Sequence, residues 1–511
     1  MRALLAKISL WRTRKPRPLT KLEAVQHVAE ATAATAKPDD DSGNPRRPAS
    51  PPPRVEDGEA GGNRSLGFSA QPSPTVHPPR IFPPTLETLP AELRIQILSH
   101  LANLKDLMAA VHASPVLYQQ YLLDRQRFLE QALRRELPGT MLADAYAVQA
   151  TTIFSTTRKY LEIHRMDQAI TRVINEYVEL RSDPNTVAGH CNLEDLINMA
   201  SFYLGVVQPL LLEFPHRMLS KLEGGPEPGA LSETERTRFL RALYRFQVFQ
   251  NLFGAGKLGS RFHHADILAE FFCMFRPWEI EEINCINQLV RTTYDAVLYE
   301  IVWDVNKDNP KFGERFNPMT PPGAFDLETA CNSFLGPARA PLSDVDKREL
   351  LLDGIVGRGL VLFHTVSRTL DHEDLVTVMQ RNLGWYLAES IDYFLNWTIQ
   401  DRRRSQQPTE DDRREADWES LPFSGDKEDG PPLAWVIIWR GTFSNTYGEV
   451  ISSAVRDWGY ILWDSRRLVR SGGKRELQKA WEDSWHGGDT SSGGLMAVMA
   501  VLSSFWYINL L

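Results

Sequence analysis

The stretch that decides the fold runs from residue 86 to residue 137 and reads LETLPAELRIQILSHLANLKDLMAAVHASPVLYQQYLLDRQRFLEQALRREL. Its local chemistry predicts three helices separated by short turns. Pro90 suits the first turn of the first helix, where its missing N–H is not needed. Asn103 can cap the second helix, and Ser114 followed by Pro115 marks the start of the third. Helices joined by such short turns should form one compact cluster.

Each predicted helix of this cluster has an apolar stripe at helical spacing. The stripe positions are Leu93, Ile97, Leu98 and Leu101 in the first helix, Leu104 and Leu107 in the second, and Leu117, Tyr121, Phe128, Ala132 and Leu133 in the third. A unit of about 50 residues buries too little apolar surface to be stable alone. We therefore expect the remaining chain, a partner protein, or both to cover these stripes.

This segment resembles the F-box motif, on the pattern Leu89-Pro90-x-Glu92-Leu93, then Ile97-Leu98-x-x-Leu101, then Leu104-x-x-Leu107. The resemblance implies a three-helix module that docks onto a Skp-type adaptor of a cullin-RING ubiquitin ligase, while the rest of the chain recruits a substrate. The adaptor contacts that it implies are Leu89, Pro90, Leu93, Ile97, Leu98, Leu101, Leu104 and Leu107.

Two further stretches are similar to a filamentous-fungal subgroup of F-box-like proteins. The first is the junction Ala113-Ser114-Pro115 with the helix that follows it, and the second is the C-terminal stretch 457–464. The chain departs from the family pattern at His112–Leu117, where the usual Cys-Arg-x-Trp-like end is absent. This departure bears on adaptor docking rather than on the helical fold.

Helical periodicity continues after the cluster. We expect helices at 164–181, 193–222, 231–251, 262–275 and 283–301, and a long helix whose stripe from Leu375 to Phe394 ends near Arg404. No alternation of strands and helices occurs, so a doubly wound sheet is disfavoured. The predicted fold class is mainly α, with a disordered N-terminal region, a three-helix F-box-like cluster and a larger irregular all-helical body.

Composition divides the chain into six segments. They are a basic amphipathic N-terminus (1–35), a disordered proline-rich linker (36–80), the F-box-like motif (81–137), a helical body (138–401), a charged disordered insertion (402–432), and an aromatic-rich C-terminal helical segment with an apolar tail (433–511). The linker is expected to be disordered because its Pro, Gly, Ser and charged residues bury too little apolar surface to offset the entropy of ordering.

The two ends of the chain leave localisation open. Residues 1–22 contain seven basic residues and no acidic one, which fits a mitochondrial presequence, a surface-binding helix or a frayed terminus. The uncharged tail 495–511 has 17 residues, whereas a membrane-spanning helix needs about 20. We expect a docked core helix or a sticky terminus there, with a tail anchor as the alternative. The expected localisation is cytoplasmic or nuclear, and the alternative is mitochondrial or tail-anchored.

Composition and motifs also argue against several functions. A net charge of −8 and a pI of about 5.9 disfavour nucleic-acid binding. The four cysteines are expected to be reduced thiols in an intracellular compartment, because their spacing fits neither a CxxC pair nor a disulfide framework; they are Cys191, Cys273, Cys285 and Cys331. No nucleophile elbow, phosphate-binding loop or metal-ligating motif is found. We expect no catalytic residue, cofactor or metal, so the protein is predicted not to be an enzyme.

Large aromatic residues are concentrated in the C-terminal segment. They are Trp435, Trp439, Trp458, Tyr460 and Trp463. Such residues commonly fill a core, and this is the first interpretation. Because large aromatics also dominate binding hot spots, the alternative is a surface that contacts a protein substrate.

These observations favour a binding protein. The resemblance implies a substrate-recruiting subunit of an SCF-type ubiquitin ligase, with a Skp-type adaptor and an unknown protein substrate as partners. The alternative is a non-catalytic structural or membrane-associated protein whose F-box-like helices pack internally. Solvent exposure of Leu89, Pro90, Ile97 and Leu101 discriminates between the two, because a contiguous exposed apolar patch indicates a partner.

Overall fold

The chain divides into two compact units, Met1–Arg80 and Ile81–Leu511. The computed structural model describes residues of the second unit only: 85–101, 103–156, 163–222, 229–254, 267, 270–313, 324–325, 344–384, 391, 423–439, 451 and 453–484. These residues form helices and turns without any β-strand, which confirms the mainly helical fold class. The predicted basic N-terminus, proline-rich linker and apolar tail lie outside the described residues.

The α-helices follow one another along the chain, most of them separated by short turns. They are α3 (Ala91–His100), α4 (Leu104–Ala113), α5 (Pro115–Leu123), α6 (Arg125–Glu136), α7 (Met141–Thr156), α8 (Ile163–Ser182), α9 (Val187–His190), α10 (Leu193–Phe202), α11 (Gln208–Leu219), α12 (Glu233–Phe253), α14 (Pro277–Ile301), α16 (Asp344–Val356), α17 (Leu360–Arg368), α18 (His372–Asn382), α21 (Leu433–Trp439), α23 (Ser453–Asp457), α24 (Ser465–Arg470) and α25 (Gly473–Ser484).

Short helical turns of other types join them. The 3-10 turns are η1 (Leu86–Thr88), η2 (Pro184–Thr186), η4 (Phe272–Met274), η5 (Pro310–Phe312) and η6 (Tyr460–Leu462), and a π-helical turn, η3 (Tyr203–Val207), lies between α10 and α11.

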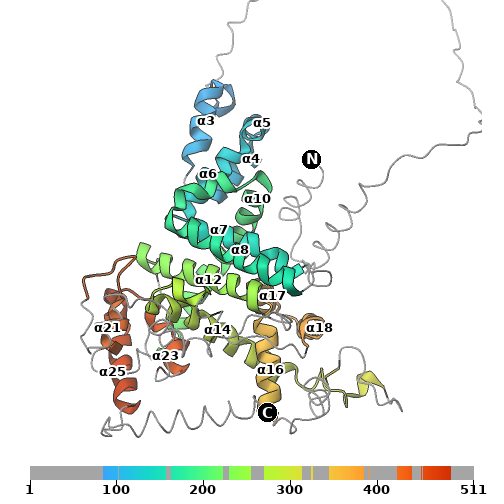
Figure 1. Ribbon diagram of the computed structural model, residues 1–511. Coiled ribbons are helices and arrows are strands. Elements are labelled where there is room, and N and C mark those ends of the chain that lie inside the picture. Colours follow the sequence, from blue (N-terminus) through green and yellow to red (C-terminus); the bar gives the residue numbers. More distant parts are fainter. Residues whose placement is uncertain are drawn as a thin grey trace, which may run out of the picture. The chain divides into compact units, whose positions relative to one another are not determined.

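Helix α12 lies at the centre of the core (Figure 1). Its first turn is closed by a capping box in which Ser232 Oγ accepts from the N–H of Glu235 at 3.1 Å, and Glu235 accepts from the N–H of Ser232 at 3.0 Å. Every residue from Thr237 to Phe253 is buried. The helix packs mainly against α7 and α14. Beyond its first turn the helix therefore has no solvent-facing side, although its sequence is rich in arginine.

The run Leu193–Leu219 combines α10, η3 and α11 in one helix. By length and composition it could cross a membrane, with a mean hydropathy of 1.3, and 50% of the apolar window is buried inside the protein. The pair Arg348–Val356 and Leu360–Arg368 passes the same test only as one span, and its halves meet at 105°. Core helices of soluble proteins have the same composition.

The N-terminal cluster contains four α-helices instead of the three predicted. The third predicted helix is broken into α5 and α6 at Asp124, whose backbone (φ −141°, ψ 41°) leaves the helical region. The stripe across the break still packs together, since the rings of Tyr121 and Phe128 stack with centroids 6.2 Å apart. Helix α5 contacts both α3 and α4, and all three contact α6, which contacts α10 of the body.

The prediction of one continuous helix from Leu375 to near Arg404 is wrong. Helix α18 ends at Asn382, because Leu383 adopts an extended backbone (φ −65°, ψ 143°) and Gly384 follows it. Apart from Ile391, the residues from 385 to 422 lie outside the described part of the chain.

The predicted charged insertion 402–432 also differs from expectation where the structure describes it. Asp426 accepts hydrogen bonds from Ser465, and the carbonyl of Glu428 accepts one from Arg241 at 3.0 Å. The Asp426 side chain and the Glu428 carbonyl therefore contact the C-terminal segment and α12, while the side chains of Lys427, Glu428 and Asp429 are exposed.

Candidate functional site

Specific hydrogen bonds fix the helix ends that border the predicted adaptor contacts. At the start of α4, Asn103 Oδ1 accepts from the N–H of Asp106 at 2.8 Å, which is the cap that the sequence predicts. At the end of α3, the Arg135 guanidinium of α6 donates to the carbonyls of Ser99 and Leu101. These carbonyls have no partner within the helix, so Arg135 replaces the missing donors.

One side of α3 carries apolar side chains that face solvent. Leu86 and Leu93 are 44% and 43% exposed, Pro90 is exposed, and Leu89 and Ile97 are half-buried. Pro90, Leu93 and Ile97 are spaced three and four residues apart, so they share one face of the helix. Leu86 and Leu89 lie in the turn that leads into it. We call these five residues the α3 face.

The other predicted adaptor contacts are buried within this chain. Leu98, Leu104 and Leu107 belong to the hydrophobic core, and Leu101 is half-buried and packs against it. A partner cannot reach the three buried side chains without unpacking α3 and α4. The predicted contact set is therefore corrected: its middle and end hold the cluster together, and only its beginning is accessible.

The cluster joins the body through a buried carboxylate, Glu136. It accepts from Tyr203 Oη at 2.6 Å, from the Arg236 guanidinium at 2.9 Å and from the N–H of Leu104 at 3.4 Å. Burial and the hydrogen bond to Glu136 raise the pKa of Tyr203, so its hydroxyl remains a donor. This carboxylate links α4 and α6 of the cluster to η3 and α12.

The aromatic residues of the C-terminal segment form core rather than a substrate surface. Trp435, Trp458, Tyr460 and Trp463 are all buried, and Trp463 Nε1 donates to the carbonyl of Trp458 at 2.9 Å. The side chain of Trp439 lies outside the described residues. The substrate-surface alternative is therefore wrong for these four, since none offers its ring to solvent.

Helix α12 carries a row of buried arginines, which was not predicted from the sequence and which we call the arginine ladder. Arg238, Arg241 and Arg245 are each no more than 3% exposed. Arg241 donates twice to Glu282, at 2.5 Å for both bonds, and Arg245 donates to Asp144 at 3.1 Å. Because a buried charge is costly unless it is paired, each arginine fixes a neighbouring element against α12.

Glu279 of α14 forms ion pairs with two arginines of this ladder. Its carboxylate lies 3.2 Å from Arg241 and 3.3 Å from Arg245. Burial opposes its ionisation, but the two guanidinium groups and a backbone N–H outweigh burial and lower the pKa of Glu279 to about 2. The carboxylate therefore stays charged and holds α14 to α12 at neutral pH.

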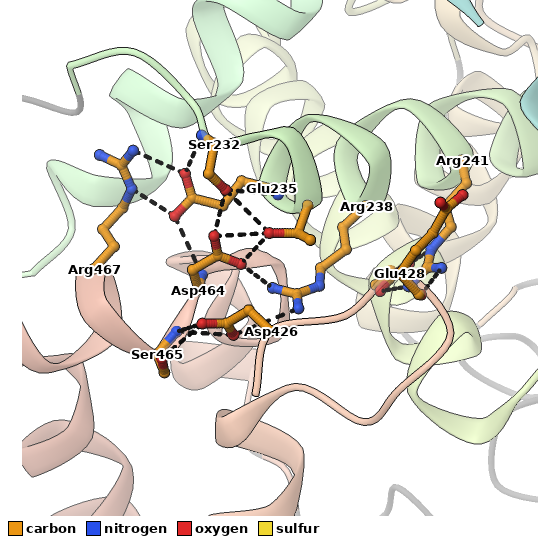
Figure 2. A network of polar contacts seen from close by, with 11 residues as sticks. Ser232, Glu235, Arg238, Arg241, Asp426, Glu428, Asp464, Ser465 and Arg467 are labelled. Atoms are coloured by element: carbon orange, nitrogen blue, oxygen red, sulfur yellow. Dashed lines mark hydrogen bonds and ion pairs between the residues drawn. The ribbon is translucent and has the colours of Figure 1, made fainter. Parts of the chain in front are cut away.

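Arg238, the first arginine of the ladder, binds the C-terminal segment, as Figure 2 shows. Asp464 accepts from Arg238 at 3.0 Å and from Thr234 Oγ1 at 2.7 Å, and it also accepts from Ser232 Oγ. The N–H of Asp464 in turn donates to Glu235 at 3.2 Å. The first turn of α12 thus receives a carboxylate from a segment more than 200 positions away.

A sequence signal for the ladder exists, although it is weak. The arginines follow one another at spacings of three and four within RFLRALYRF, so they share a helix side, while apolar residues occupy the other sides. A helix that is apolar around most of its circumference is a buried helix. Charges regularly spaced on such a helix predict buried ion pairs, but the partner residues cannot be assigned from spacing.

Metal-ligating and nucleophilic side chains were also compared with the site that the sequence predicts. Among the described residues, no group of three His, Cys, Asp or Glu side chains could hold a metal ion. Burial raises the pKa of the Cys191 thiol to about 12 and also raises that of Cys285, so both thiols are protonated at neutral pH. The arginine ladder is enclosed by its carboxylate partners. The α3 face is the part of the predicted site that is open to another molecule.

The fold and this site define a helical protein with an exposed apolar helix at its N-terminal cluster. No family model, curated protein or solved structure matches the chain.

Proposed function

We propose that the protein is a non-catalytic recruiting subunit that binds a Skp-type adaptor through the α3 face. The observation that carries this proposal is the exposure of Pro90 and Leu93, at the beginning of the F-box-like pattern, and of Leu86 just before it. The same pattern buries its later leucines in the chain's own core. A helix that served internal packing alone would turn its apolar residues inward.

The energetic argument concerns the accessible leucines. Covering one leucine side chain that is partly exposed contributes up to about 1.5–3 kcal/mol to association. The α3 face offers five apolar residues at the entry to one helix, so a groove that accepts them would gain several such contributions. This arrangement is the helix-in-groove mode, in which residues spaced three and four apart serve as anchors.

The proposed mechanism uses proximity. The helical body binds a protein substrate while α3 binds the adaptor, and the effective concentration of substrate at the ligase rises without any catalytic group from this chain. The link through Glu136 supports this role, because its carboxylate accepts two hydrogen bonds from the body, from Tyr203 and Arg236, and one from Leu104 within the cluster.

The test replaces the exposed leucine and its neighbour on α3 in the full chain. The double variant Leu93→Asp with Ile97→Asp should reduce affinity for a purified Skp-type adaptor by at least 100-fold, because two charges would enter an apolar groove. The matched control is Leu123→Asp, since Leu123 lies in the same cluster and is 81% exposed but is outside the α3 face. The control should bind as the wild type does, and binding is measured by isothermal titration.

Two outcomes would reject the proposal. One is an adaptor that fails to bind the wild-type chain, and the other is a double variant that binds with wild-type affinity. Equal helical content in the double variant and the control, measured by circular dichroism, shows that loss of binding is not loss of folding.

A further inference from the structure

The turn before α3 presents three residues of the α3 face, although it has little regular structure of its own. It consists of η1 followed by Leu89 and Pro90, whose backbones are both extended (ψ 147° and 150°). The carbonyls of Glu87 and Leu89 precede the helix, so no N–H of the helical ladder is available to them. Without another donor, this turn would depend on water.

Arg94 supplies that donor. Its Nη1 donates to the carbonyl of Glu87 at 3.0 Å and to the carbonyl of Leu89 at 2.8 Å. Side chains of an α-helix point toward its N-terminus, so a residue in the first turn can reach back over the entry to the helix. A cation near a helix N-terminus interacts unfavourably with the helix dipole. The carbonyl contacts offset this cost and give a physical reason for arginine at this position.

A second tether connects the turn to α5. Ser114 Oγ donates to the Glu87 carboxylate at 2.6 Å and accepts from the N–H of Leu117 at 3.3 Å. Ser114 is buried and Glu87 is exposed, so this bond is partly buried. The Glu87 residue is thus held at its carbonyl by Arg94 and at its carboxylate by Ser114.

We infer that Arg94 is a positioning residue, which holds Leu86, Leu89 and Pro90 in line with Leu93 so that the α3 face meets its partner preformed. This inference rests on the proposed function and extends it to the control of docking geometry. A preformed turn avoids the entropy of ordering, which otherwise reduces affinity. The guanidinium acts on the backbone of the turn, and direct contact with the partner is not needed.

The experiment compares Arg94→Ala with Arg94→Lys in the full chain. Hydrogen exchange of residues 85–93 is measured without the adaptor, and adaptor affinity is measured separately. Arg94→Ala should raise exchange in the turn and weaken binding about tenfold. Arg94→Lys should recover part of both, because a single nitrogen makes both carbonyl contacts. The matched control is Arg127→Ala, an exposed arginine of the same cluster, which should change neither.

The outcomes separate the two proposals. If Arg94→Ala leaves both exchange and affinity at wild-type values, the positioning role is wrong while adaptor binding stands. If exchange rises but affinity is unchanged, the turn is held by Arg94 without serving docking, and the inference fails. If the wild-type chain does not bind the adaptor, the proposed function fails, and the docking role of Arg94 fails with it.

Discussion

Leu93 and Leu98 occupy the same helix, yet their environments are opposite. Leu98 is 2% exposed and belongs to the core, whereas Leu93 is 43% exposed. The F-box-like pattern predicts both as adaptor contacts. A sequence pattern records spacing, but it does not record which side of a helix another element covers. Coverage of α3 is set by α5 and α6, which contact it.

Replacement of each leucine by alanine should therefore have different effects on stability. Leu98→Ala removes buried methyl groups and leaves a cavity, which should cost about 2–5 kcal/mol of the free energy of unfolding. Leu93→Ala should change it by less than about 0.5 kcal/mol. Urea unfolding followed by circular dichroism measures both. Equal costs for the two variants would show that the α3 face is covered by the chain itself.

Glu279 gives the fold a defined dependence on acid. Its folded pKa is about 2 against an ordinary 4.5, so its stabilising effect is complete above pH 4.5 and is lost as the pH falls toward 2. A shift of this size corresponds to a contribution on the order of 3 kcal/mol.

The variant Glu279→Gln keeps an acceptor for the N–H of Arg276 but removes the charge. It should be less stable than wild type at pH 7, and the difference in unfolding free energy should shrink as the pH falls from 4.5 to 2. A stability difference that is constant across this range would rule out an ionised Glu279 as its cause.

At the scale of elements, a histidine connects the end of α14 with the start of α18. His372 Nδ1 lies 3.2 Å from Glu300 and Nε2 lies 3.0 Å from Asp304. Hydrogen bonds to these carboxylates raise the pKa of His372. Its contribution to stability is present at acid pH, below the pKa of the unfolded chain, and is lost as the pH rises through the folded pKa.

We expect the imidazole of His372 to titrate above its usual range, with the pKa falling in the double variant Glu300→Gln with Asp304→Asn. NMR of labelled histidine, assigned with His372→Asn, measures this pKa. An unchanged titration in the double variant would show that the carboxylates do not hold the ring.

Several elements could be predicted from the sequence because their signals are local. The caps at Asn103 and Ser114, and the apolar period of α14, are properties of neighbouring residues. The break at Asp124 and the end of α18 at Asn382 were not predicted, because the apolar stripes continue past both points. Periodicity reports which residues prefer burial, and it is silent about where the backbone bends between them.

At the scale of the whole molecule, contacts far apart in sequence decide the fold. The arginine ladder ties α7, α14 and the C-terminal segment to α12 through ion pairs whose members are up to 226 positions apart. Such pairs cannot be derived from spacing. Of the predicted site, Pro90 and Leu93 are exposed, and Leu89, Ile97 and Leu101 are half-buried. The buried members are Leu98, Leu104, Leu107, Trp435, Trp458, Tyr460 and Trp463.

The bond between Asp464 and Arg238 should hold the C-terminal segment in place. Asp464→Ala leaves the buried Arg238 without its nearest carboxylate, which typically costs about 3–5 kcal/mol. We expect faster tryptic cleavage within residues 466–470, measured by mass spectrometry of the fragments. The control Asp308→Ala, at an exposed aspartate, should leave the rate unchanged. A wild-type rate in Asp464→Ala would contradict the role of the ladder in binding this segment.

We propose that the α3 face docks the adaptor, while Leu98, Leu104 and Leu107 of the same pattern lie in the core. The most direct measurement is hydrogen exchange of the full wild-type chain with and without a saturating purified Skp-type adaptor. We expect new protection confined to residues 85–97, with exchange in 104–111 and 458–463 unchanged. Protection that is absent from residues 85–97, or that appears only in other parts of the chain, would show that the α3 face does not dock the adaptor.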